Sequence, residues 1–431
     1  MPDTHTSSHP TPSITPILAI NFVGTLGFSI VLPFLVFLVT RLGGNALIYG
    51  VMGATYSIFQ LIGAPILGRW SDRYGRRRIL LLSQLGTLAS WAIFLTALFL
   101  PAITMVEVDS SVLGAFTLTV PLLILFLARA LDGITGGNVS VANAYLADVT
   151  PEQERSTNFG KMALSSNLGF IVGPALAGVL GATALGEIPP VVAALLISAV
   201  ASVLIVRLPD SSPCTLERNP ERSAVHHMMG QEQKECIELH PTTSLSVGEV
   251  LRLPGVAFLL ALYFLVFLAF NFFYITFPVW AVSGLEWTLP QIGVFFSVMG
   301  LSMALVQGPV LNRASRVLSD RTLVIGGSAL LAVSFLFFTS PSLYAIYSGT
   351  LALAIGNGVM WPSLMAVLSR SSDSATQGSV QGVASSVGAF ASIIGLIVGG
   401  FLFGFLGSNV FLISTVLITF VFLVSFRIPK G

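Results

Sequence analysis

Charged side chains are scarce in this sequence: they make up 9% of its 431 residues, whereas 54% are hydrophobic. A soluble domain carries about 25% charged residues, which cover its water-facing surface. The composition therefore excludes a set of ordinary soluble domains and indicates a chain whose main solvent is lipid. The net charge of +1 gives no reason to expect nucleic acid as a partner.

Cysteine and histidine are also rare, and their positions exclude further classes. Cys214 and Cys236 lie in the most polar stretch, where they fit free thiols better than a disulfide framework. No histidine falls in a long apolar run, which disfavours a membrane enzyme with a metal motif or a serine–histidine pair. His226, His227, Cys236 and His240 match no standard zinc spacing, so we interpret them as part of a solvated linker and expect no metal.

Long apolar runs fill most of the chain. A bilayer core needs roughly 20 apolar residues per helix, because the backbone there must satisfy its own hydrogen bonds. Such runs occur at 14–39, 46–67, 79–100, 117–143, 158–181 and 190–207, and again at 254–282, 290–311, 322–340, 343–369, 377–403 and 406–427. The pattern predicts an all-α membrane protein with twelve transmembrane helices in two six-helix bundles.

The runs divide the chain into four predicted parts. Residues 1–13 are polar and predict a disordered cytoplasmic tail, and residues 14–207 form the first bundle. Residues 208–250 are rich in charge, proline and serine, which is typical of a flexible cytoplasmic linker. Residues 251–431 form the second bundle with a short tail.

The distribution of cations predicts the orientation. Lysine and arginine gather on the cytoplasmic side of membrane proteins. With both termini in the cytoplasm, 18 of the 20 Lys and Arg fall in cytoplasmic loops, span ends or tails; Arg41 alone lies outside, and Arg129 lies within a span. We therefore expect a multi-pass membrane protein with both termini cytoplasmic.

An internal repeat relates the two halves. Residues Ala64–Ser71, after the second run, match residues Gly308–Ser315, after the eighth, without a gap; Arg316 stands where the first copy has Asp72. Duplicated halves are typical of transporters that rock about a central site. Chance similarity of two membrane-exit loops is the alternative.

Three motifs resemble those of the major facilitator superfamily. Residues Gly68–Arg78, with Gly68, Asp72, Arg73, Gly75 and Arg76 in the matching places, resemble its signature loop. Residues Arg129–Gly137 resemble its arginine-centred motif, and residues Gly169–Gly178 resemble a motif associated with antiporters.

Shorter stretches resemble one branch of that family. Residues Tyr56–Gln60, Ala144–Pro151 and Gln377–Gly382 are similar to the tetracycline-efflux branch of the twelve-span drug–proton antiporters. The resemblance implies the major facilitator fold, a monomer in the lipid of the cell inner membrane, and a small-molecule substrate. It also implies no enzymatic activity, and a proton gradient as energy source with no cofactor. The branch usually has an aspartate nine residues before the proline of span 1, where this chain has Gly24, which argues against tetracycline itself as the substrate.

The resemblance implies that the signature loop is a gate. Its glycines are expected to form a tight turn, and Asp72 to face the start of span 11, where a helix N-terminus carries partial positive charge. Arg76 is expected to reach a carboxylate at the end of span 4, with Asp148 the candidate. Together with Gly68, Arg73 and Gly75 these residues would stabilise one of two global states. The alternative is a loop that is basic only because it faces the cytoplasm.

Span 4 contains the acid and the base that we find within spans. Arg129 lies near the membrane midplane and Asp132 one turn further toward the cytoplasm on nearly the same face. Intramembrane charges are costly and often mark proton relays. We hypothesise that Asp132 carries the coupling proton and that Arg129 modulates its release. The alternative is a permanent ion pair that packs span 4.

The antiporter motif places Gly169, Gly173, Pro174 and Gly178 in span 5. Small residues at such spacing let helices approach closely, and proline bends the helix. The resemblance implies that this region seals the outer end of the cavity.

Amide and aromatic side chains within spans are candidates for substrate contacts, because such walls suit amphipathic organic compounds. The candidates are Asn21, Gln60, Asn271, Asn357 and Trp361. Each amide could equally join two helices by a hydrogen bond.

The sequence thus predicts proton-coupled export, by antiport, of small amphipathic or lipophilic compounds such as drugs. Uptake or facilitated diffusion of a metabolite or lipid-like molecule is the alternative within the same fold. A receptor or lipid-handling protein is not separated from these by sequence.

Overall fold

The computed structural model describes residues 14–31, 33–136, 138–150, 154–208, 245–371 and 376–429. The predicted tail at 1–13, most of the predicted linker, and the cysteines and linker histidines lie outside these residues.

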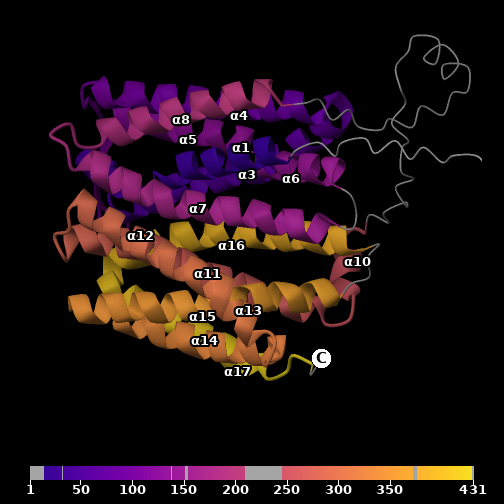
Figure 1. Ribbon diagram of the computed structural model, residues 1–431. Helices are drawn as coiled ribbons and strands as arrows, with labels where there is room; N and C mark the ends of the chain where they lie inside the picture. The colour runs from indigo at the N-terminus through magenta and orange to yellow at the C-terminus, as the bar shows by residue number, and fades with distance from the viewer. Residues whose placement is uncertain are drawn as a thin grey trace, which may run out of the picture.

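Two groups of long helices lie side by side, one from each half of the chain (Figure 1). The elements of the first half are α1 (Thr15–Ser29), α2 (Leu35–Arg41), α3 (Ala46–Tyr74), α4 (Arg76–Phe99), β1 (Thr104–Ser110), β2 (Gly114–Thr119), α5 (Val120–Thr135), α6 (Asn138–Val149), α7 (Arg155–Gly181) and α8 (Ile188–Val206). Those of the second half are α10 (Val247–Arg252), α11 (Val256–Ser283), α12 (Leu289–Leu305), the π-helical turn η2 (Val306–Val310), α13 (Leu311–Ala314), α14 (Asp320–Phe337), α15 (Leu343–Arg370), α16 (Gln377–Leu406), the 3₁₀ turn η3 (Gly407–Asn409) and α17 (Val410–Ser425).

These helices account for the predicted crossings. Among the described residues, nine stretches are long and apolar enough to span a membrane, and the last of them, Ser379–Ser425, contains both α16 and α17. Two shorter helices complete the set: α1 has 15 residues, and α5 has 16 and is followed closely by α6. The prediction of an all-α membrane protein with twelve crossings is therefore confirmed.

The signature segment is mostly helical, which corrects the predicted loop. Helix α3 continues to Tyr74 and α4 starts at Arg76, so Gly75 alone forms the turn, with φ 98°. That backbone conformation favours glycine, because it lacks a Cβ. Gly68 lies inside α3, so a role for it in the turn was wrong.

The second copy of the repeat has a different backbone. Pro65 lies within the uninterrupted helix α3, whereas Pro309 lies in η2, the π-helical turn between α12 and α13. A π-turn inside a helix often marks a functional position. The two matching segments therefore diverge in conformation as well as in charge.

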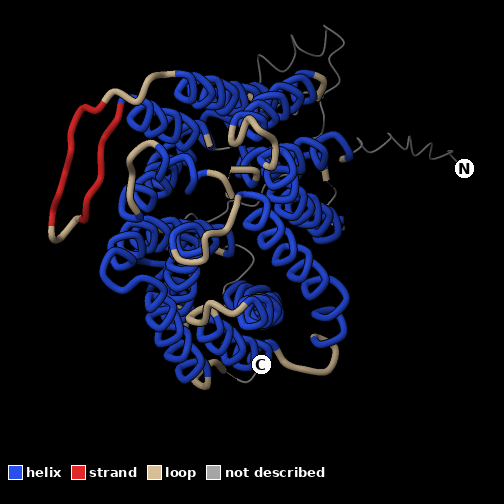
Figure 2. The backbone as a smooth tube through the Cα atoms, turned by 90° about the vertical axis from the view of Figure 1, so that its left-hand side faces the viewer, coloured by secondary structure: helices blue, strands red, loops and turns tan. Residues whose placement is uncertain are grey.

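A two-stranded antiparallel hairpin, which the sequence did not predict, joins α4 to α5. Strands β1 and β2 pair from Thr104↔Thr119 to Ser110↔Gly114. Figure 2, viewed from one end of the bundle, shows the hairpin lying beside the helices and beyond their outline. We call this the hairpin end. The opposite end, where α3 meets α4, is called the basic end.

The last residues of the predicted linker, 245–250, are ordered. Ser246 caps α10 by donating its backbone N–H and its hydroxyl to Glu249 Oε2, each at 2.7 Å. These hydrogen bonds hold the pKa of Glu249 below its usual value. Leu245 N donates to Ser379 Oγ at 3.0 Å, which attaches this segment to α16.

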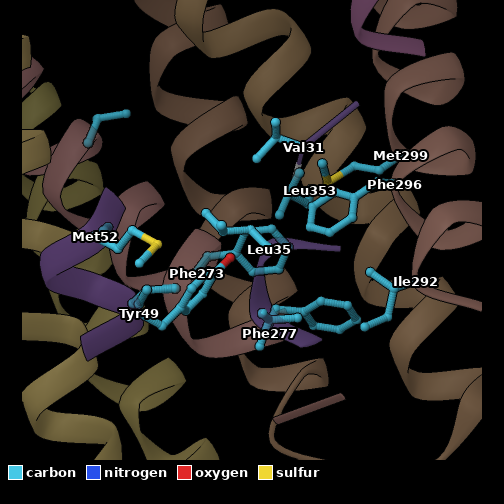
Figure 3. Close-up of a cluster of buried hydrophobic side chains, with 14 of the residues drawn as sticks. Val31, Leu35, Tyr49, Met52, Phe273, Phe277, Ile292, Phe296, Met299 and Leu353 are labelled. Carbon is cyan, nitrogen blue, oxygen red and sulfur yellow. The ribbon is translucent and has the colours of Figure 1, made fainter. Parts of the chain in front are cut away.

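The hydrophobic core consists of two clusters, and only one of them contains residues of both halves. One cluster contains buried side chains of both halves; Figure 3 shows Val31, Leu35, Tyr49 and Met52 of the first half beside Phe273, Phe277, Ile292, Phe296, Met299 and Leu353 of the second. A separate cluster, which includes Leu67, Ile79 and Leu146 near the basic end, contains residues of the first half alone. The first half therefore contributes to the shared core with side chains away from the basic end.

Ion pairs at the basic end repeat with reversed charge. Arg76 Nε, at the start of α4, donates to Asp148 Oδ2 in α6 at 3.0 Å. The match that places Ala64 over Gly308 places Arg76 over Asp320, at the start of α14, and Asp320 pairs with Arg370 at the end of α15. The contact between equivalent helix ends is thus kept while acid and base change places.

A second contact repeats with the same charge. Arg77 donates to the carbonyl oxygen of Val206 at the end of α8. Its counterpart Arg321 donates to the carbonyl oxygen of Phe426, just after α17. These matching contacts support the predicted repeat.

Candidate functional site

The larger cavity lies within the first half and has a volume of about 270 Å³. Its lining comes from α1, α3, α4, α5, α7 and α8, and from Gly136 just after α5. Three predicted site residues, Asn21, Gln60 and Asp132, meet in its wall. Gly24, which stands where the tetracycline branch has an aspartate, lines it too, so Asp132 is the acidic residue of this lining.

Asp132 is buried and has two partners on opposite oxygens. Thr87 Oγ1, on α4, donates to Asp132 Oδ1 at 2.9 Å. Arg129 Nη1 lies 3.7 Å from Asp132 Oδ2, which is an ion pair longer than an ordinary hydrogen bond. The side chains are only 8% (Arg129) and 11% (Asp132) exposed, so both charged groups are largely buried.

Arg129 is incompletely satisfied. Its Nε is buried without a hydrogen-bond partner among the described residues. Its guanidinium lies over the ring of Tyr56, 5.8 Å from the ring centroid, which is a cation–π contact. Arg129 is therefore close enough to influence Asp132, but it does not hold the carboxylate in a tight bidentate pair.

A row of hydroxyl groups on α4 faces α5, and sequence reasoning missed it. Ser83 donates to the carbonyl oxygen of Thr135, Thr87 to Asp132, and Ser90 to the carbonyl oxygen of Ala128 at 2.7 Å. The spacing of 83, 87 and 90 puts the three on one helix face. This polar stripe in an apolar helix was the signal that could have identified Thr87.

Asn21 joins two helices at the cavity wall. Its Nδ2, on α1, lies within hydrogen-bonding distance of three acceptors on α7: Met162 O (3.0 Å), Ser165 Oγ (2.6 Å) and Ser166 Oγ (2.7 Å). The amide therefore has a structural role whether or not a substrate contacts it.

Gln60 is fixed where α3 and α5 approach closely. Its Nε2 lies 3.1 Å from Tyr56 Oη and 3.2 Å from the carbonyl oxygen of Gly136. Gly133 permits this approach, because a Cβ there would lie 2.4 Å from the carbonyl oxygen of Tyr56. The two motif helices thus present Gln60 and Asp132 to one cavity.

The three candidates of the second half do not line this cavity. Asn271 Nδ2, on α11, donates to Phe267 O at 2.8 Å and to Ser392 Oγ on α16 at 3.1 Å. Trp361 lies against Tyr263, with ring centroids 4.9 Å apart, and half-buried Asn357 lies one turn before it on α15. Asn271 and Trp361 thus pack the second bundle.

A smaller cavity of about 150 Å³ lies on the seam between the halves. Phe170 lines both cavities, so they adjoin at this residue. Asn167 Nδ2 on α7 donates to Gln307 Oε1 in η2 at 3.3 Å, which is a hydrogen bond from one half to the other.

The antiporter-like segment brings α7 into close contact with two helices. A Cβ at Gly173 would lie 2.0 Å from Ser29 Oγ, and one at Gly169 would lie 2.9 Å from the backbone of α1. Further along, a Cβ at Gly293 of α12 would lie 2.6 Å from Gly178 Cα and 2.8 Å from the carbonyl oxygen of Pro174. The segment therefore closes the seam between α7 and α12 toward the hairpin end.

Helices α3 and α16 close the second seam at the same end. A Cβ at Gly50 would lie 2.2 Å from the carbonyl oxygen of Leu396, and one at Gly400 would lie 2.4 Å from that of Ala46. Toward the basic end, Gly68 of α3 has no atom within 4 Å of such a Cβ.

The signature segment lies at the basic end. The expected ion pair between Arg76 and Asp148 is present, and Arg76 Nη1 also donates to Ser71 Oγ at 2.7 Å. Arg73 is exposed and its guanidinium lies 5.5 Å from the ring centroid of Tyr74. The side chain of Asp72 lies outside the description, so its expected contact with α16 stays a prediction.

Comparison with known families decides the class. The model of the Major Facilitator Superfamily matches residues 17–319 and 259–431, which together cover nearly the whole chain. The chain belongs to the Major Facilitator Superfamily. The protein is therefore a multi-pass membrane transporter of a small molecule and not an enzyme.

Relatives of known name cover almost the full length. The chain is 31% identical to the class E tetracycline resistance protein of Escherichia coli over 396 residues, which are 90% of this chain and 86% of that protein. It is 27% identical to multidrug resistance protein 1 of Bacillus subtilis (strain 168) over 400 residues, 91% of this chain and 90% of that protein. Among superfamily transporters it is thus related to tetracycline and multidrug resistance proteins.

Solved structures share the fold. The human organic anion transporter MFSD10 (TETRAN) superposes with a TM-score of 0.66 at 23% identity, covering 96% of this chain and 98% of that one. The D-xylose–proton symporter superposes with a TM-score of 0.73 at 15% identity, covering 97% and 98%.

Proposed function

We propose that this transporter exports small amphipathic or lipophilic compounds, such as drugs, in exchange for protons. The observation that carries the proposal is Asp132: a buried carboxyl group that lines the cavity, is held by Thr87 and stands beside a guanidinium. A carboxyl group in this position can take up a proton when the cavity opens to one side and release it on the other.

Arg129 is proposed to modulate that proton. At 3.7 Å it favours the charged form of Asp132 without fixing it in a tight pair. A permanent packing ion pair would be expected to have closer, hydrogen-bonded geometry. The Nε of Arg129 is buried without a hydrogen-bond partner among the described residues, and we propose that this guanidinium acquires a further partner at another stage of the cycle.

The proposed substrate site is the cavity of the first half. Amides of Asn21 and Gln60 and rings of Phe28, Tyr56 and Phe170 offer polar and aromatic contacts together. Such a lining suits a planar or amphipathic molecule. Resemblance to drug-resistance proteins over about nine-tenths of the chain supports this class. The absence of a carboxylate at Gly24 argues for a substrate other than tetracycline.

The structure is consistent with one state of an alternating-access cycle. We assign the basic end to the cytoplasm, because arginines gather on that side. The shared hydrophobic core and the glycine contacts of α7 with α12 then close the cavity toward the outside. We propose that Arg76 and Asp148, both in the first half, fix the helix ends of that half at the cytoplasmic gate, which is open when the outside is closed.

Proton movement in everted membrane vesicles tests this function. The vesicles are energised to an acidic interior, a pH-sensitive dye reports the gradient, and antibiotics, dyes and biocides are added in turn. We expect some compounds to dissipate the gradient with the wild-type protein and none to do so with Asp132→Asn. A matched control, Asp109→Asn, makes the same change at an exposed hairpin residue and should behave as wild type.

Two outcomes would contradict the proposal. Normal substrate-driven proton movement in Asp132→Asn, at equal amounts of inserted protein, would exclude Asp132 as the proton carrier. Substrate flux without proton movement in the wild type would favour facilitated diffusion instead.

A further inference from the structure

The hairpin between α4 and α5 has one apolar and one polar face. Side chains alternate between the two faces of a strand. The pairs Val106↔Leu118 and Val108↔Phe116 lie on one face, whereas Glu107↔Thr117 lies on the other together with Asp109↔Ala115. Both charged residues of the hairpin thus lie on the face opposite the valines.

The hairpin is attached to the bundle by one edge. Thr117 N, on β2, donates to the carbonyl oxygen of Gly43 at 2.8 Å, and Asn45 Nδ2 donates to Leu113 O at 2.9 Å. Strand β2 is therefore next to the turn between α2 and α3, and β1 is the outer strand. Figure 2 shows both strands side by side when the molecule is viewed from the hairpin end, so the faces of the hairpin point roughly along the helix axes.

The apolar face is the one that turns toward the bundle and the bilayer. Phe116 and Leu118, on β2, pack against the shared hydrophobic core. Val106, on the same face of the outer strand, is 50% exposed, and Val112 near the tip is 55% exposed. Phe99 at the end of α4 and Ile103 just before β1 are also exposed apolar side chains, at 68% and 57%.

We propose that this hairpin lies flat on the bilayer surface, with Val106 and Val112 at the boundary between headgroups and acyl chains. The polar face, with Glu107 and Asp109, then faces water. Amphipathic elements bind at this boundary through buried apolar area and, where they are basic, through anionic lipid. Residues 101–128 contain no Lys or Arg, so the hairpin binds by apolar contact and takes zwitterionic lipid.

The position of the hairpin gives this contact a mechanical role. The hairpin leads directly into α5, the helix that carries Arg129 and Asp132, and its backbone is bonded to the turn that precedes α3. Helix α3 is also the partner of α16 across the seam between the halves. Lipid contact therefore restrains the hairpin ends of two helices that line the candidate site.

Spin labels on neighbouring residues of the hairpin test the proposal. Cys214 and Cys236 are replaced by serine, and single cysteines are introduced at Val106 or Val112, with Glu107→Cys as the matched control on the other face. The labelled full-length proteins are reconstituted in zwitterionic lipid vesicles. Collision rates are measured with oxygen, which concentrates in the bilayer, and with a water-soluble nickel chelate.

We expect the oxygen-to-nickel collision ratio to be several-fold higher at 106 and 112 than at 107. Adding anionic lipid should leave the ratios unchanged. Equal nickel access at all three positions would show a hairpin in water and overturn the proposal. Spectral broadening by labels on neighbouring chains would also overturn it, because it would show that β1 pairs with a second copy. A Val106→Asp variant should lower the oxygen collision rate at a label on 112; an unchanged rate would contradict the lipid contact.

Discussion

Gly293 on α12 permits a close approach between the halves, and its replacement should open the seam between α7 and α12. In Gly293→Ala the new Cβ would lie 2.6 Å from Gly178 Cα and 2.8 Å from the carbonyl oxygen of Pro174. Carbon atoms prefer separations of about 3.5–4.0 Å, so α7 and α12 would need to move apart by about 1 Å. The clash exists only in the state in which this seam is closed.

The expected magnitude follows from the cost of overpacking. An extra methyl group in a well-packed interface costs about 1–3 kcal/mol. If that cost falls on the closed seam alone, the equilibrium shifts toward the open seam by about 5- to 150-fold. Alanine is the better helix former by about 1 kcal/mol, but this gain applies to any folded state in which α12 stays helical, so it does not oppose the shift.

Thiol labelling measures this equilibrium. Met299 lines the seam cavity and is only 4% exposed. A Met299→Cys reporter, with the native cysteines replaced, should react with a membrane-impermeant maleimide faster in Gly293→Ala than in the parent protein. The control is Gly308→Ala in the same span, where a Cβ would have no atom within 4 Å, and its labelling should match the parent. Equal labelling in Gly293→Ala and Gly308→Ala would refute the reasoning.

Three further predictions concern contacts elsewhere in the bundle. Arg76→Asp and Asp148→Arg should each lower thermal stability, and the double exchange should restore part of it. Because the pair is partly exposed, we expect a coupling free energy of about 0.2–1 kcal/mol in a double-mutant cycle. Additive effects of the two substitutions would contradict the ion pair. Asn21→Leu should destabilise the protein in detergent by about 0.5–2 kcal/mol through lost bonds between α1 and α7, and an unchanged melting temperature would show that these bonds contribute nothing. Ser246 lowers the pKa of Glu249. The stabilisation of the folded protein by this cap is therefore complete at pH values above the pKa of the unfolded carboxyl group, and it is lost as the pH falls through the pKa of the folded one. Ser246→Ala should therefore raise the pKa of Glu249, followed by the carbon chemical shift of labelled glutamate.

The sequence predicted the crossings because lipid imposes a length and a composition on every span. It also predicted the pair Arg76–Asp148 and the proximity of Arg129 to Asp132, since both follow from motif positions or from spacing on one helix. The segment Gly68–Arg78 was misread as a loop, because a turn of one glycine at Gly75 leaves both flanking helices intact. These features depend on local sequence, which explains why most of them could be anticipated.

What the sequence did not predict depends on how each helix is rotated. Apolar composition indicates that a segment crosses the membrane, but most sides of a span are apolar, so the side facing a cavity is not marked. Asn21 and Asn271 were therefore equal candidates, and the sequence did not indicate that Asn21 lines the first-half cavity while Asn271 bonds to Ser392 on α16. Thr87 was missed for the same reason. The hairpin escaped notice because its alternating pattern is short and merges with the apolar run of α5.

The reversed ion pairs at the basic end bear on how two unlike halves can share an ancestry. In a chain with two identical halves, both ion pairs would have the base on the same one of the two helix ends. Exchanging acid and base in one ion pair takes two substitutions, and the first alone places two like charges together. Because an exposed pair contributes only about 0–1 kcal/mol, such a half-exchanged ancestor would still fold. In weak surface ion pairs of this kind, the positions of acid and base can therefore be exchanged during evolution, while the packing that brings the helix ends together is kept.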